Sequence, residues 1–141
     1  LISKIPPEVG NLKNEVKILD GMKILLVEDS PDNQHLIRIM LSRAGATSDI
    51  ASDGREGVEM ALAKSYDAVL MDIQMPHMDG LEAVSLLRAQ NYRKPVIALT
   101  AHAMKEHKAQ ALGAGFTDFL SKQIQHDPMI EVLSRILEEK N

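Results

Sequence analysis

Short aliphatic runs alternate along the chain with amphipathic stretches of helical period. Apolar runs of this length, ending abruptly at polar residues, are typical of strands buried on both faces of a parallel sheet. Five such runs alternate with five helical stretches, which predicts a doubly wound α/β fold with helices on both faces of the sheet. The predicted strands cover residues 23–27, 48–51, 68–71, 96–99 and 118–120.

Residues that favour helix ends mark the limits of the predicted helices. Ser30 and Pro31 suit the start of the first helix, and Gly45 suits a left-handed residue at its end. Asp53 and Asp79 are each followed three residues later by a glutamate, which is the spacing of a capping box. The helices are predicted from Ser30 to Gly45, from Asp53 to Lys64, from Asp79 to Ala89, over about Met104–Leu112 with a stop at Gly113 and Gly115, and from Asp127 onward.

Residues 1–21 differ from the rest, because prolines, a glycine and asparagines interrupt any long element. We interpret 1–21 as a linker or N-terminal extension, in which Leu12, Val16 and Leu19 have the spacing of a short helix. The globular domain is predicted over 22–141. The chain begins at leucine instead of methionine, which suggests a piece of a longer protein.

The composition narrows the class of protein. The chain has 141 residues, 45% of them apolar and only 3% aromatic, so one domain with an aliphatic core is expected. The net charge of -4 and the few aromatic residues argue against a nucleic-acid surface. Cysteine is absent, which excludes disulfides and thiolate metal sites. No apolar stretch approaches the roughly 20 residues that span a bilayer, so we expect a cytoplasmic domain without direct membrane contact.

Polar residues follow four of the predicted strands. Glu28 and Asp29 come after the first, Asp72 after the third, Thr100 after the fourth and Lys122 after the fifth. Ligands of open parallel sheets sit beyond the carboxyl ends of the strands. Three carboxylates, a hydroxyl and an ammonium would therefore meet in one crevice, a set that suits a divalent metal and a phosphoryl group. Without metal, the carboxylates should repel each other and raise at least one pKa.

Several motifs now point to a family. The segments Val27–Asp29, Leu70–Pro76 with Asp79-Gly80, Ala98–Ala101 and Phe119–Lys122 resemble the receiver domains of two-component signalling, and the resemblance covers about residues 22–139. It implies a flavodoxin-like sheet in the order 2-1-3-4-5. The segment Leu99–Met104 is most similar to receivers fused to hybrid sensor histidine kinases.

The resemblance implies that Asp72 accepts a phosphoryl group from a phosphohistidine, carried by a histidine kinase or a histidine phosphotransfer domain. Mg²⁺, or Mn²⁺, would balance the charge. It would be held directly by Asp29 and Asp72, by the main-chain carbonyl of Gln74, and mainly through water by Glu28. The domain would then be a phosphoacceptor with at most slow self-dephosphorylation, not an enzyme, although its parent chain could be a kinase.

The resemblance also implies a switch. Lys122 and Thr100 would bind phosphoryl oxygens, and Thr100 and Phe119 would move with activation. That movement would change the face formed by the fourth helix, the fifth strand and the last helix, which could also form a dimer. The positions expected to tune access to the phosphoryl group are Gln74, Ala101 and His102.

One position departs from the family pattern, since Gln123 stands where a proline usually follows the lysine. A cis bond there would cost about 2.5–4 kcal/mol, against roughly 0.5–1 kcal/mol before proline. The loop is therefore either trans, with Lys122 placed differently, or strained.

Three other functions compete with the hybrid-kinase receiver. A stand-alone single-domain response regulator would carry the same motifs. A phosphatase of the haloacid dehalogenase type needs a second aspartate two residues after the nucleophile, where Gln74 stands. A nucleotide or flavin domain is disfavoured because the turn 28–33 has no glycine and several acids, which would repel phosphate.

Overall fold

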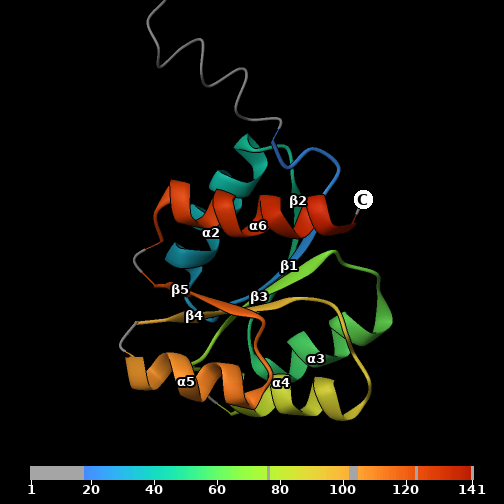
Figure 1. Cartoon of the computed structure of the whole chain (residues 1–141), viewed down its shortest axis with the longest axis vertical. Helices are drawn as coiled ribbons and strands as arrows, with labels where there is room; N and C mark the ends of the chain where they lie inside the picture. Colours follow the sequence, from blue (N-terminus) through green and yellow to red (C-terminus); the bar gives the residue numbers. More distant parts are fainter. Residues whose placement is uncertain (1–17, 76, 102–104, 123, 141) are drawn as a thin grey trace, which may run out of the picture.

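The computed structural model describes residues 18–75, 77–101, 105–122 and 124–140. Its five strands are β1 (Lys23–Val27), β2 (Thr47–Ala51), β3 (Ala68–Asp72), β4 (Val96–Thr100) and β5 (Asp118–Ser121). They pair in parallel in the order β2-β1-β3-β4-β5 (Figure 1). The helices of the described part are α2 (Pro31–Arg43), α3 (Gly54–Ala63), α4 (Gly80–Ala89), α5 (Lys105–Ala114) and α6 (His126–Lys140). The predicted doubly wound fold and strand order are confirmed.

The helices form one layer on each face of the sheet (Figure 1). α2 and α6 cover one face, and α3, α4 and α5 cover the other. Alternate residues of a strand point to opposite faces. On β1, Ile24 and Leu26 therefore join the core beneath α2 and α6, whereas Leu25 and Val27 join the core beneath the other three helices. Because both faces are buried, all five residues of β3 and of β4 are buried as well.

The start of the described chain packs against the domain. Leu19 is fully buried in the core beneath α2 and α6, and its N–H donates to the carbonyl of Ala44 at 2.7 Å. Residues 18–21 thus contact the domain that the sequence predicted to begin at residue 22. The helix proposed around Leu12 and Val16 lies outside the described residues.

Side-chain caps fix the helix starts that the sequence predicted. The Asp53 carboxylate accepts from the N–H of Glu56 at 2.8 Å, and the Asp79 carboxylate accepts from the N–H of Glu82 at 2.9 Å. Asp79 therefore starts α4 directly after the loop that follows β3. This places the helix N-terminus beside the carboxyl end of the sheet.

Two glycines show how helix ends are selected. Gly45, with φ +94°, follows α2 as predicted. The stop predicted at Gly113 is wrong, because α5 continues to Ala114. The helix ends before Gly115, whose φ of +122° is one that residues with a side chain rarely adopt.

Arg88, on α4, joins two loops at the amino end of the sheet. Its guanidinium donates to the carbonyls of Tyr92, Lys94 and Gly115 at 2.6, 2.9 and 2.9 Å, and to the hydroxyl of Thr117 at 3.3 Å. Burial lowers the pKa of this half-buried arginine. Four oxygen acceptors stabilise its charge. No carboxylate is among its contacts in the described part of the chain.

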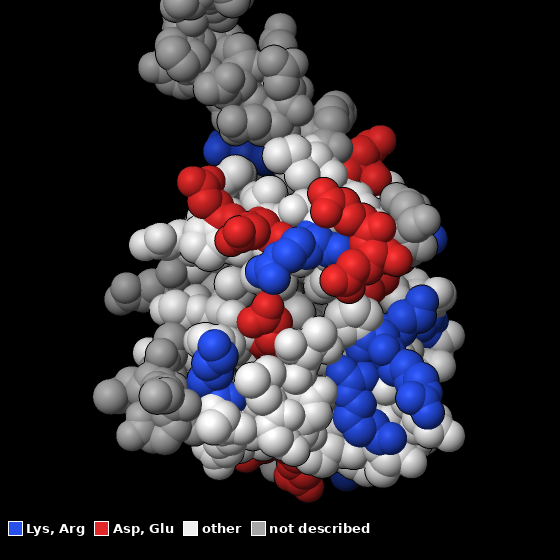
Figure 2. Space-filling model, viewed as in Figure 1, with Lys and Arg blue, Asp and Glu red and all other residues white. Residues whose placement is uncertain are grey.

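The outer face of α6 is charged. Figure 2 shows acidic side chains around a basic one over this helix. The exposed charged residues of α6 include Glu131, Arg135, Glu138 and Glu139, while Met129 and Leu133 are fully buried beneath them. No helix in the described part of the chain combines the length and apolar character needed to cross a membrane.

Candidate functional site

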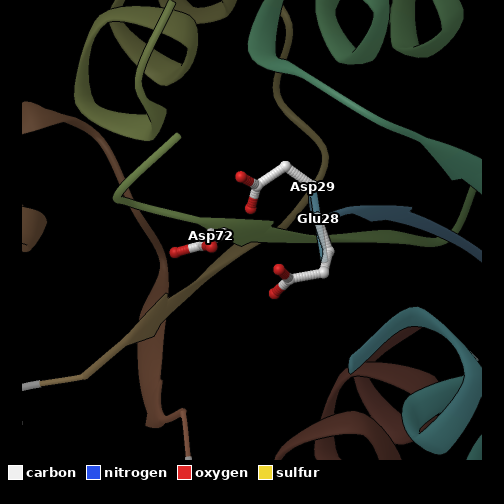
Figure 3. Close-up of side chains that lie close together, drawn as sticks. All are labelled: Glu28, Asp29 and Asp72. Carbon is white, nitrogen blue, oxygen red and sulfur yellow. The ribbon is translucent and has the colours of Figure 1, made fainter. Parts of the chain in front are cut away.

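The predicted acids meet at the carboxyl end of the sheet. Glu28 and Asp29 directly follow β1, and Asp72 is the last residue of its neighbour β3. One carboxylate oxygen from each lies within 4.8 Å of the other two. In Figure 3, the carboxylates of Glu28 and Asp29 extend from β1 toward the side on which Asp72 lies. The parallel pairing of β1 with β3 thus builds the cluster that the sequence predicted.

The three acids differ in exposure. Glu28 and Asp72 are fully buried as residues, whereas Asp29 is exposed. Two charges are therefore held inside the protein and one faces solvent. This arrangement leaves the cluster open on the side of Asp29.

Lys122 supplies the positive charge beside the two buried acids. Its ammonium lies 2.8 Å from Asp72 Oδ2 and 4.0 Å from Glu28 Oε2. Burial by itself would lower the pKa of Lys122, but the hydrogen bond to Asp72 and the charges of all three acids outweigh it and raise the pKa. The lysine is thus held in its charged form.

The surroundings of Glu28 disfavour its charged form. Burial, the largest effect, and repulsion from Asp72 raise the pKa of Glu28 above its ordinary value. The hydrogen bond from Ser30 lowers this pKa but does not outweigh them. The N–H of Ser30 donates to Oε2 at 3.0 Å. The other oxygen, Oε1, is buried and has no hydrogen-bond partner among the described residues. A buried oxygen in this state requires a cation or a water.

The donor set fits a hard divalent cation. All three side chains offer carboxylate oxygens, which Mg²⁺ and Mn²⁺ prefer, and Oε1 of Glu28 is an acceptor without a partner. Gln74 lies next to the cluster, because its N–H donates to Asp72 Oδ1 at 3.0 Å. The role of its carbonyl as a ligand stays a prediction.

Thr100 ends β4, next to β3, and is 7% exposed. Its carbonyl accepts from the N–H of Lys122 at 2.6 Å, which fixes the backbone of the lysine to the end of β4. Thr100 also lines a cavity of about 600 Å³ together with Gln74 and Gln110. The structure therefore brings the hydroxyl and the lysine to the same end of the sheet as the acids.

The remaining predicted residues have separate positions. Phe119 is half-buried on β5, and the ammonium of Lys108 on α5 lies 5.1 Å from the centre of its ring. Ala101 is exposed directly after β4. His102 and Gln123 lie outside the described residues, so the geometry of the bond after Lys122 stays open.

Sequence reasoning missed the contacts that hold Glu28. The amide of Gln34, on the first turn of α2, donates to the main-chain carbonyl of Glu28 at 2.6 Å. Ser30 was expected only to cap the helix, and it does accept from the N–H of Asn33, at 3.4 Å. No local signal identifies Gln34, since a glutamine on a helix is usually solvated.

Comparisons with known proteins agree with this geometry. The model of the response regulator receiver domain family matches residues 24–134. The chain is 39% identical over 117 residues to the signal transduction histidine-protein kinase BarA of Escherichia coli, and 41% identical over 119 residues to hybrid signal transduction histidine kinase G of Dictyostelium discoideum. These matches cover 82% and 81% of the chain but only 13% and 4% of the relatives. The chain thus corresponds to a small part of each.

Two solved structures are similar over most of the chain. The receiver domain of the Francisella response regulator 1452 has a TM-score of 0.82 at 28% identity, covering 86% of this chain and 100% of that one. The receiver domain of a sensor histidine kinase from Pseudomonas aeruginosa has a TM-score of 0.78 at 39% identity, covering 84% and 98%. The latter structure has a magnesium ion coordinated in its active site cleft.

Proposed function

Because this chain belongs to the response regulator receiver domain family, we propose that it accepts a phosphoryl group on Asp72 as a step in a phosphorelay. The observation that carries the proposal is the buried Asp72 carboxylate, 2.8 Å from the Lys122 ammonium and beside two further acids. The donor would be a phosphohistidine of a histidine kinase or a phosphotransfer domain. The hybrid kinases among the relatives support a receiver module within such a kinase. The cytoplasmic location stays a prediction.

In the proposed transfer, a carboxylate oxygen of Asp72 attacks phosphorus. An O–P bond forms as the N–P bond of the donor breaks, and the electron pair of that bond returns to the imidazole. A divalent cation held by Glu28, Asp29 and Asp72 would supply charge neutralisation when bound. Lys122 neutralises Asp72 before transfer and can move to a phosphoryl oxygen afterwards. The domain holds and loses this group, and does not turn over a substrate.

The surface beside the cluster suits a helical donor. α2 begins two residues after Asp29 and exposes Leu36 and Ile39, which are 49% and 37% accessible. They lie three residues apart and therefore on neighbouring positions of the helix surface. Exposed apolar residues next to a reactive site favour docking of an apolar helix face. We place the phosphohistidine partner there.

Switching would follow from the new group. Thr100 and Lys122 can donate to phosphoryl oxygens, and Phe119 would respond on the α5–β5–α6 face, where a dimer could also form. Moving a two-state balance from 1:99 to 99:1 needs about 5.5 kcal/mol. Hydrogen bonds to charged groups contribute about 1.5–3 kcal/mol each. Two such bonds supply about 3–6 kcal/mol, and Lys122 gives up its contact with Asp72 to form one of them. The isolated domain should therefore switch incompletely until a partner binds.

The experiment that tests the function is phosphorylation by a small acyl phosphate with Mg²⁺. Intact-mass measurement should show one added phosphoryl group on the wild type and none on Asp72→Asn. Asp127→Asn, an exposed acid on α6, is the matched control and should be labelled like the wild type. The proposal would be contradicted if Asp72→Asn were labelled as much as the wild type. It would also be contradicted if the wild type were labelled equally well after Mg²⁺ is removed by a chelator.

A further inference from the structure

The peptide group between Glu28 and Asp29 is anchored from α2. Its carbonyl, which belongs to Glu28, accepts from the side-chain amide of Gln34 at 2.6 Å. The preceding peptide is anchored from β2, since the N–H of Glu28 donates to the carbonyl of Ala51 at 3.0 Å. Both peptide planes next to the Glu28 Cα atom are therefore fixed by hydrogen bonds.

This hydrogen bond ties the backbone that carries two acids to α2. Without it, the backbone of Glu28 and Asp29 could shift relative to the helix, and both carboxylates would shift with it. Gln34 is itself well anchored, because its N–H donates to the carbonyl of Ser30 at 2.9 Å in the first turn of α2. The first turn of the helix thus acts as a rigid support for the acidic pair.

The carboxylate of Glu28 is constrained by the same turn. The N–H of Ser30 donates to its Oε2, while Oε1 stays buried without a partner among the described residues. The atom that is left for a cation is the oxygen without a hydrogen-bond partner among the described residues. Contacts of the helix with the carbonyl and with Oε2 therefore determine where Oε1 is presented.

We propose that Gln34 is a positioning residue for the cation site, acting through the Glu28–Asp29 peptide. This inference rests on the proposed metal-dependent function of the cluster. Loss of outer-shell hydrogen bonds typically weakens metal binding about 10- to 100-fold. Since Gln34 supports ligands through the main chain, about tenfold weaker Mg²⁺ binding is expected without its amide.

The test is calorimetric titration of Mg²⁺ into the wild type, Gln34→Met and Gln90→Met. Methionine has the length and helix preference of glutamine but no donor. Gln90 is exposed at the end of α4, and its side chain has no hydrogen bond in the described part of the chain. Gln34→Met should bind Mg²⁺ about tenfold more weakly, and Gln90→Met should bind like the wild type. Gln34→Leu, measured in parallel, should repeat the loss.

A second measurement separates positioning from general destabilisation. The carbonyl ¹³C shift of Glu28 in the metal-free protein should change in Gln34→Met and not in Gln90→Met. Equal Mg²⁺ affinity of the wild type and Gln34→Met would refute this inference alone. A similar loss in both glutamine variants would also refute it. Absence of Mg²⁺ binding by the wild type would refute the proposed function and this inference with it.

Discussion

Replacing Asp72 by asparagine removes one of three clustered carboxylates with little change in shape. In the metal-free protein, the variant loses an attraction to Lys122 across 2.8 Å. It also loses repulsion from Glu28 and Asp29, whose ligand oxygens lie within 4.8 Å. The sign of the effect on stability depends on which of these contributions is larger.

The two contributions nearly cancel. At an effective dielectric constant of about 20, the attraction is about 6 kcal/mol and the repulsion from buried Glu28 about 3.5 kcal/mol. The exposed Asp29 is screened by solvent and adds only about 1 kcal/mol of repulsion, so a net attraction of about 1.5 kcal/mol remains. Asp72 is also fully buried, and burying an ion costs several kcal/mol, more than this net attraction and more than burying a neutral amide. Asp72→Asn should therefore stabilise the metal-free domain by about 1–3 kcal/mol.

Urea unfolding followed by circular dichroism measures this difference. In chelator, Asp72→Asn should unfold at higher urea than the wild type. Mg²⁺ should reverse the order, because a ligand at 100 times its dissociation constant adds about 2.7 kcal/mol to the protein that binds it. Asp20→Asn, which removes an exposed charge outside the cluster, should change stability by less than about 0.5 kcal/mol.

Two results would refute this reasoning. If Asp72→Asn were less stable than the wild type in chelator, the attraction to Lys122 would dominate and the cluster would not be strained without metal. If Mg²⁺ stabilised both proteins equally, Asp72 would not be a ligand.

Three further predictions test other parts of the molecule. The hydrogen bond from the Tyr66 hydroxyl lowers the pKa of Asp49, so this acid contributes stability that is lost as pH falls through its folded pKa. In Tyr66→Phe, a carboxyl ¹³C titration should show the pKa of Asp49 moving up toward 3.8, and the acid-side loss of stability should shrink; an unchanged titration would contradict it. Gly80→Ala should lower the unfolding free energy by about 1–3 kcal/mol, because a Cβ there would clash with the main-chain oxygen of Asp72 at the end of β3. A Cβ added at Gly113 would have no atom within 4 Å, so Gly113→Ala should raise the unfolding free energy by about 0.5–1 kcal/mol. Urea midpoints that shift in the same direction in both glycine variants would refute this distinction. Thr100→Ala should still be phosphorylated but should lose most of the chemical-shift change on the α5–β5–α6 face, and a full change there would exclude a role for its hydroxyl.

Local patterns were enough to predict the elements and the members of the cluster. The caps at Asp53 and Asp79 join residues three apart, so the sequence displays them directly. The meeting of Asp29 with Asp72 follows from parallel strands that share a carboxyl edge. These predictions required only short-range periodicity and a general rule about sheets.

Contacts between distant segments could not be read in this way. The Tyr66 hydroxyl meets Asp49 across 17 residues, and the Arg88 guanidinium meets Gly115 across 27. Neither pair has a spacing that a helix or strand would produce. The difference between buried Glu28 and exposed Asp29 also depends on tertiary packing, because adjacent acids after a strand look equivalent in the sequence.

The division of the site among strand ends has a consequence for folding kinetics. Lys122 and Asp72 meet across 50 residues. The acids that follow β1 reach Asp72 only after β1 has paired with β3, which is its neighbour in the sheet but does not follow it directly in the chain. Contacts that close such long loops form slowly, and they form late in folding when few other contacts hold the two segments together. If the strand ends join after the transition state, bound cation retards unfolding and leaves the refolding rate unchanged. The carboxylates that form the acidic cluster would then also set the lifetime of the native sheet.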